Sequence, residues 1–423
     1  MAKNKLSNIF KGDKVIWFIF FLLAVVSIVE VYSASSQLTY KHGNYFAPIT
    51  KHIGFIFLGG FAIVLTLNIK CKYFKILTPF LLIFTFATLI WALVAGESTN
   101  GASRWVGIFG MQFQPSEIAK GTLVLTTAQI LSALQTDKGA DPKAFKYICL
   151  VAGPILFLIL LENLSTAFLL GLVVILMMVI GRVSSKSIGS LLGLIALVGL
   201  LGFAAIMLFG ETEQPTDSKQ QLTEQVVKKK EKPSGIKSVF HRFDTWKARI
   251  ENFAQKKHVE PDEVDLDKDA QTAHANIAIA SSNIIGKGPG KSDERDFLSQ
   301  AFSDFIYAIV IEELGIGGAI VVALLYIILL FRVGYIAKRC ENTFPAFLIM
   351  GLALLLVTQA LFNMCVAVGL VPVTGQPLPL VSRGGTSTIV NCIYIGAILS
   401  VSRTAKKKNP SRRENASGKL AVA

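Results

Sequence analysis

The chain has 423 residues, of which 52% are hydrophobic and only 17% are charged, and its mean hydropathy is +0.55. This composition is too apolar for an ordinary soluble domain, so it excludes the soluble enzyme classes and indicates a membrane protein. The formal net charge is +14, from 42 Lys and Arg against 28 Asp and Glu.

Apolar stretches of about 20 residues, the length that crosses a bilayer, recur along the chain. We therefore predict an all-α polytopic membrane protein with about ten transmembrane helices. A polar patch at Glu162-Asn163 divides one long apolar run into two helices. The stretch 117–134 opens with charged residues, so an interfacial segment stays open there. The predicted spans are 15–35, 53–69, 75–95, 117–134, 146–161, 165–181, 188–209, 305–331, 345–370 and 384–402.

Lys and Arg are concentrated in alternate short loops, which places those loops and both termini in the cytoplasm. The same bias explains most of the net charge, so we expect no nucleic-acid partner. The predicted regions are a cytoplasmic tail at 1–14, seven helices in 15–210, a large extracytoplasmic loop at 211–303 between the seventh and eighth helices, three helices in 304–402, and a basic cytoplasmic tail at 403–423.

Residues 101–120, GASRWVGIFGMQFQPSEIAK, form the first polar constellation. Glu117 and Lys120 are three residues apart, so both can face one side of a helix. Arg104 and Lys120 could therefore flank an anionic group near the outer membrane surface. The alternative is that Arg104 reaches lipid headgroups while Glu117 simply pairs with Lys120.

The segment 286–292, GKGPGKS, is similar to a phosphate-binding P-loop. That motif needs a glycine five residues before the final glycine, Gly290, and Ile285 stands there instead. No strand is predicted before it, and the topology places it away from cytosolic ATP. We therefore do not expect ATP to bind.

Asp304 follows this polar region and precedes a long apolar stretch that contains Glu312 and Glu313. Acids within a membrane span are costly, so such positions indicate function by default. Asp304 could instead cap a helix beginning at Phe305, because Asp is a favoured capping residue.

Two further polar groups lie near the C-terminus. Gln359 and Asn363 are four residues apart on one helical face, where they could bind substrate or hold helices together. Residues 371–387, VPVTGQPLPLVSRGGTS, contain three prolines and a glycine pair. Such residues predict non-helical backbone, which is tolerated at membrane depth only inside protein or beside a wet cavity. Arg383 within it could bind an anion or pair with Glu312 or Glu313.

Three ordered blocks, Gly101 to Lys120, Asp304 to Gly315 and Pro372 to Ser387, resemble the signatures of the SEDS family (shape, elongation, division and sporulation), which includes FtsW and RodA. The likeness covers nearly the whole chain. The segments HANIAIASSNIIGKGPGKS and FLSQAFSDFIYA are more similar to the division branch, FtsW. An aromatic residue is common in the family at position 383, where this chain has Arg383.

The resemblance implies a peptidoglycan glycosyltransferase that polymerises lipid II, the undecaprenyl-pyrophosphate-linked disaccharide-pentapeptide, at the outer face of the bacterial cytoplasmic membrane during cell division. It implies Asp304 as the base that takes the acceptor hydroxyl proton. Substrate-binding roles then fall to other residues of the three motifs. Arg104 and Lys120 would hold the pyrophosphate, Glu117 would orient Lys120, Trp105 would shape the groove, and Ser382 with Gly384-Gly385 would offer backbone N–H groups.

The implied partners are a class B penicillin-binding protein and other divisome proteins, at the septum. The resemblance makes no cofactor certain, and a divalent cation, Mg or Mn, stays open. Two other function classes also stay open, a lipid II flippase and a non-catalytic divisome scaffold. A flippase should carry polar residues across the membrane depth, whereas here most cluster at the outer ends. A scaffold would leave Asp304 and Lys120 without a role.

Overall fold

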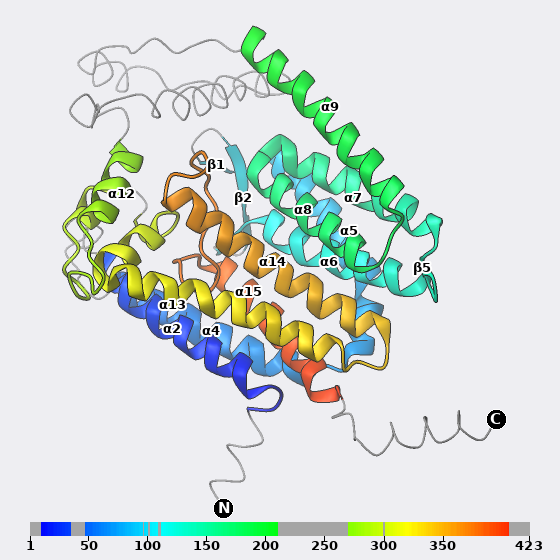
Figure 1. Ribbon diagram of the computed structural model, residues 1–423, viewed down its shortest axis with the longest axis horizontal. Coiled ribbons are helices and arrows are strands. Elements are labelled where there is room, and N and C mark those ends of the chain that lie inside the picture. Colours follow the sequence, from blue (N-terminus) through cyan, green and yellow to red (C-terminus); the bar gives the residue numbers. More distant parts are fainter. Residues whose placement is uncertain are drawn as a thin grey trace, which may run out of the picture.

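The structure is a computed structural model that describes residues 10–34, 47–95, 97–99, 102–108, 111–209, 270–298 and 301–405. Within these ranges the protein is a bundle of long helices, several of which run side by side (Figure 1). The long helices are α2 (Lys14–Ala34), α4 (Ala47–Asn68), α5 (Cys71–Ala95), α6 (Pro115–Ala133), α7 (Pro142–Glu162), α8 (Leu164–Ile180), α9 (Ser185–Phe209), α13 (Ile306–Ala337), α14 (Thr343–Ala367) and α15 (Thr386–Thr404).

The all-α polytopic class is confirmed, and each predicted span overlaps one of these helices, with no bound more than six residues away. Seven of the described helices are long and apolar enough to cross a membrane, and α8 is a shorter apolar helix. The turn predicted at Glu162-Asn163 is present. Asn163 both ends α7 and caps α8, where its Oδ1 accepts a hydrogen bond from Thr166 N at 3.2 Å.

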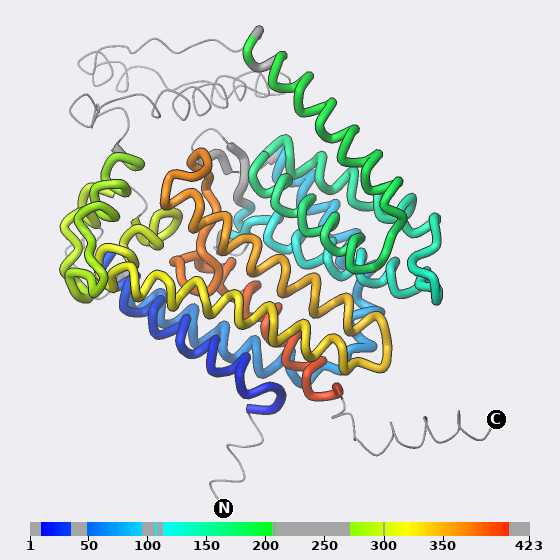
Figure 2. Tube along the Cα trace, in the orientation of Figure 1, coloured from blue at the N-terminus to red at the C-terminus, as the bar shows by residue number. Residues whose placement is uncertain are grey.

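Helices α6, α14 and α15 pack against one another, and most of their side chains are buried. This burial favours a position within the bundle for 117–134 over the interfacial alternative. Protein rather than lipid surrounds α6, which is why it tolerates charges in its first turn. In contrast, α9 extends away from the bundle (Figures 1 and 2). Most of its described side chains are exposed.

Short strands join α5 to α6. Strands β1 (Glu97–Thr99), β2 (Ala102–Ile108) and β3 (Met111–Phe113) form an antiparallel sheet in that order. A second small hairpin, β4 (Gln135–Thr136) with β5 (Gly139–Ala140), joins α6 to α7.

The end of the predicted large loop is folded. Helix α12 (Ala270–Ala280), an ordered loop and a short 3-10 helix η2 (Glu294–Asp296) pack beside the start of α13. Helix α13 is broken at Gly315, whose φ of 72° and ψ of 179° interrupt the helical backbone. Residues 211–269, the larger part of this loop, lie outside the described residues.

At the opposite end of the bundle, Asp13 connects three helices. Its carboxylate lies 2.7 Å from Arg332 Nη2 on α13, and its backbone N–H donates to Ser402 Oγ on α15 at 3.0 Å. Helices α2, α13 and α15 are thus joined far from the sequence motifs.

Candidate active site

Asp304 lies in a turn immediately before α13 and is partly exposed. The capping alternative is contradicted, because α13 begins at Ile306 and its N-cap residue is Phe305. The Asp304 carboxylate Oδ1 accepts a hydrogen bond from Ser303 Oγ at 3.0 Å. The side chain is therefore a partly exposed carboxylate directly before the N-cap residue of α13.

Three hydrogen bonds hold the backbone around Asp304, and all come from the other C-terminal elements. Asn363 Nδ2 on α14 donates to Asp304 O at 2.8 Å. In the segment before α15, Ser382 Oγ donates to Ser303 O at 2.5 Å and Arg383 N donates to Phe302 O at 2.9 Å. The structure thus brings the second and third sequence motifs together at Asp304.

Lys120 on α6 is fully buried, and its Nζ lies 2.8 Å from Glu117 Oε1. The same ammonium donates to Gln359 Oε1 on α14 at 2.8 Å. The predicted pairing of Glu117 with Lys120 is therefore present. Because Gln359 lies one turn before Asn363, α14 connects this ion pair to the Asp304 turn.

Gln359 and Asn363 both support the non-helical segment as well. Gln359 Nε2 donates to Pro377 O at 3.0 Å, and Asn363 Nδ2 donates to Gln376 O at 2.8 Å. Of the two interpretations left open by sequence, substrate binding and holding helices together, these contacts favour the structural one, and they attach α14 to the non-helical segment as well as to α6. Gln376, which the sequence did not single out, reaches Thr166 Oγ1 on α8 at 2.6 Å.

Residues 371–385 are non-helical, as predicted from their prolines and glycines. The N–H of Ser382 bonds to Leu378 O at 2.9 Å and that of Arg383 is also engaged, so neither is available to a substrate. This corrects part of the predicted role of Ser382. Gly384 and Gly385 lie at the donor-rich start of α15, where Gly385 is the N-cap residue.

Arg383 does not pair with Glu312 or Glu313, so that alternative is wrong. Its guanidinium lies 5.3 Å from the ring centroid of Phe302, a cation–π contact. Its Nη1 is buried and has no hydrogen-bond partner among the described residues. A buried guanidinium N–H ordinarily has an acceptor, so Arg383 has donor capacity for an anionic ligand.

Four predicted residues remain. Arg104 and Trp105 belong to strand β2, but their side chains lie outside the described part of the chain. Glu312 and Glu313 are fully buried in α13, two turns beyond Asp304, where they bind the loop 286–293. Within the described ranges, no group of three or more His, Cys, Asp or Glu side chains could hold a metal ion.

Comparison with known proteins gives one family. The family described as "Cell cycle protein", FtsW/RodA/SpoVE, matches residues 13–407. Curated relatives include the peptidoglycan glycosyltransferase MrdB of Escherichia coli K12, 27% identical over 92% of this chain and 93% of that protein. Another is a probable peptidoglycan glycosyltransferase FtsW of Geobacter metallireducens, 28% identical over 96% of this chain and 98% of that protein.

Solved structures share the fold. A chain from a peptidoglycan synthase complex, solved to explain how polymerization and crosslinking are coordinated, superimposes with a TM-score of 0.68 at 22% identity. It covers 94% of this chain and 99% of its own. Thermus thermophilus RodA gives a TM-score of 0.61 at 22% identity, with 95% and 100% covered.

Proposed function

Because the chain belongs to the FtsW/RodA/SpoVE family of cell cycle proteins, we propose that it is a peptidoglycan glycosyltransferase that polymerises lipid II. The observation that carries this proposal is the attachment of the Asp304 turn to α14 and to the segment before α15. A carboxylate held in this way is preorganised for proton transfer, and its partial exposure leaves it accessible to a substrate.

In the proposed reaction, the acceptor sugar's hydroxyl oxygen attacks the anomeric carbon of the donor sugar. Asp304 takes the hydroxyl proton as the new glycosidic bond forms. The bond to the undecaprenyl pyrophosphate breaks, and that group leaves with the electron pair. Cations near the pyrophosphate stabilise the charge that develops on it.

Arg383 is the best-placed cation for that role, because its Nη1 has no partner among the described residues. Arg104, from β2, is the second candidate. Glu117 and Gln359 engage two of the three N–H donors of the Lys120 ammonium, so one donor is left for the pyrophosphate. Glu117 would then orient Lys120.

We propose that the enzyme acts in cell division at the outer face of the cytoplasmic membrane, with both termini in the cytoplasm. Motif likeness to the division branch supports this role. A class B penicillin-binding protein is the proposed partner, supported by the fold shared with a chain of a peptidoglycan synthase complex.

Reconstitution of the purified full chain in liposomes with labelled lipid II tests the function, with and without the penicillin-binding protein. We expect glycan polymer. Transfer of lipid II between leaflets without polymer would support a flippase instead. The absence of both polymerisation and transfer would support a scaffold.

A further inference from the structure

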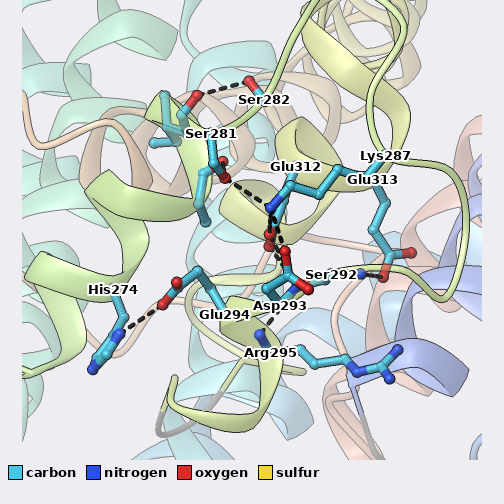
Figure 3. A network of polar contacts seen from close by, with 12 residues as sticks. His274, Ser281, Ser282, Lys287, Ser292, Asp293, Glu294, Arg295, Glu312 and Glu313 are labelled. Atoms are coloured by element: carbon cyan, nitrogen blue, oxygen red, sulfur yellow. Dashed lines mark hydrogen bonds and ion pairs between the residues drawn. The ribbon is translucent and has the colours of Figure 1, made fainter.

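The loop 286–293 wraps around the two buried glutamates of α13 (Figure 3). Lys287 Nζ lies 2.6 Å from Glu312 Oε1, and Asp293 N donates to the same oxygen at 3.0 Å. Ser292 Oγ donates to Glu312 Oε2. Both carboxylate oxygens of Glu312 are therefore bound by this loop.

Glu313 is bound in a similar manner. Gly290 N donates to its Oε2 at 2.8 Å, and Ser292 N donates to its Oε1 at 3.2 Å. Ser33 Oγ on α2 also donates to Oε1, and Arg295 Nη1 contacts Ser33 Oγ at 3.1 Å. The glutamate thus joins α2, the loop and α13.

These contacts explain the P-loop-like sequence. Successive backbone N–H groups in a glycine-rich loop form an anion-binding concavity, and here the anions are the protein's own carboxylates. Burial would lower the pKa of Lys287, but its hydrogen bonds to Glu312 and Asp293 raise it above the ordinary value, so Lys287 remains a cation. We call Gly286–Asp293 with Glu312 and Glu313 the glutamate clamp.

Close backbone packing fixes where the clamp sits. Gly286 has a φ of +85°, and a Cβ there would lie 2.3 Å from Glu313 O and 2.4 Å from Gly315 N. Ile316 N and Gly317 N, just past the break in α13, donate to Asn283 O and Ile284 O at 3.1 and 3.2 Å. Residues 283–286, which lead into the clamp, therefore pack against the break in α13.

The clamp also closes a loop in the chain. The chain leaves the clamp at Asp293, passes through η2 to Asp304, and returns along α13 to Glu312. The hydrogen bond from Asp293 N to Glu312 Oε1 joins the two ends of this segment, 293–312. A closed loop has fewer conformations than an open one, so the clamp restricts the segment that carries Asp304.

We propose that Glu312 and Glu313 are positioning residues for Asp304, acting through the glutamate clamp, and not substrate contacts. This inference rests on the proposed function, in which Asp304 is the base. The clamp holds the two ends of segment 293–312 together. Asn363, Ser382 and Arg383 hold the backbone of its residues 302–304.

Gly286→Ala and Glu313→Gln test the inference in the full chain, with Gly369→Ala as the matched control. Gly369 also has a positive φ, at +72°, but it lies outside the clamp, and a Cβ there would come no closer than 3.8 Å to its nearest neighbour, Asn276 Oδ1. Two quantities are measured for each variant: hydrogen exchange of residues 294–304, and kcat for polymerisation alongside the Kd for lipid II.

We expect faster exchange and a kcat at least ~10-fold lower in the two clamp variants, because small misplacements of a catalytic group can cost up to ~100-fold. The Kd for lipid II should stay within ~3-fold of wild type, because the clamp variants remove no contact with the bound substrate. Gly369→Ala should remain nearer to wild type in both measurements.

Unchanged exchange, or faster exchange with wild-type kcat, would overturn the inference, and so would a loss confined to lipid II affinity. If the clamp variants fail to fold, Lys287→Met removes only the partly exposed cation and undergoes the same two measurements. A wild-type chain that makes no polymer would instead refute the proposed function, and the exchange measurement would still decide whether the clamp orders the Asp304 segment.

Discussion

At the scale of single residues, Lys120 has two possible roles, pyrophosphate binding and structural pairing with Glu117. A single and a double variant distinguish them. Removing one partner of a buried ion pair strands the other charge and costs about 3–5 kcal/mol, whereas replacing both partners costs much less. We expect Lys120→Met to be strongly destabilised and Lys120→Met/Glu117→Gln to recover most of the thermal stability.

The polymerisation rate of the double variant then decides the role of Lys120. If Lys120 binds the pyrophosphate as proposed, the stable double variant remains at least ~10-fold slower, because a cation is missing where charge develops. Recovery of the rate together with stability would make Lys120 a structural residue.

Arg383 belongs to the same scale. Hydrogen bonds to charged groups contribute about 1.5–3 kcal/mol, so Arg383→Gln should weaken lipid II binding by roughly 10- to 100-fold with little change in thermal stability. Arg383→Lys, which keeps the charge, should be affected less. Binding measured by titration of the detergent-solubilised variants checks this, and unchanged affinity with lowered stability would refute it.

At the scale of elements, α15 approaches α4 closely at Gly396, where there is no room for a side chain. A Cβ at Gly396 would lie 2.9 Å from Ile63 O and 2.8 Å from Thr66 Cβ, whereas one at Gly60 would meet nothing within 4 Å. We expect Gly396→Ala to destabilise the protein by about 1–3 kcal/mol through overpacking. Gly60→Ala should be neutral or stabilising, because alanine favours helix.

Thermal unfolding of both glycine variants in detergent provides the measurement. Equal stabilities of the two variants would show that α4 and α15 are not in the close contact described.

The elements also show what sequence alone could predict. Helix positions follow from apolar stretches, since a bilayer demands about 20 apolar residues. The clamp could not be predicted, because Ser33 and Glu313 are 280 residues apart and carboxylates and phosphates attract the same backbone donors. Ser292 and Lys287 were visible only as part of a P-loop-like motif. The position of Asp304 was predictable, but its backbone partners on α14 and before α15 depend on packing.

At the scale of the whole molecule, the orientation in the membrane remains a prediction from the distribution of Lys and Arg. In a cysteine-free background, cysteine at Ser234 should react with an impermeant thiol reagent in intact cells. Cysteine at Thr136, exposed in the β4–β5 hairpin, should react only after permeabilisation. The opposite pattern would place Asp304 on the cytoplasmic side and exclude the proposed reaction.

The most direct test of the account is polymerisation of lipid II by Asp304→Asn in liposomes. Asparagine keeps the size and polarity of the side chain but cannot accept the proton. The variant should therefore fold and bind lipid II while polymerising at least ~100-fold more slowly, the lower range for loss of a general base. An Asp304→Asn variant that polymerises at nearly the wild-type rate would contradict the account, because no other residue is assigned as the base.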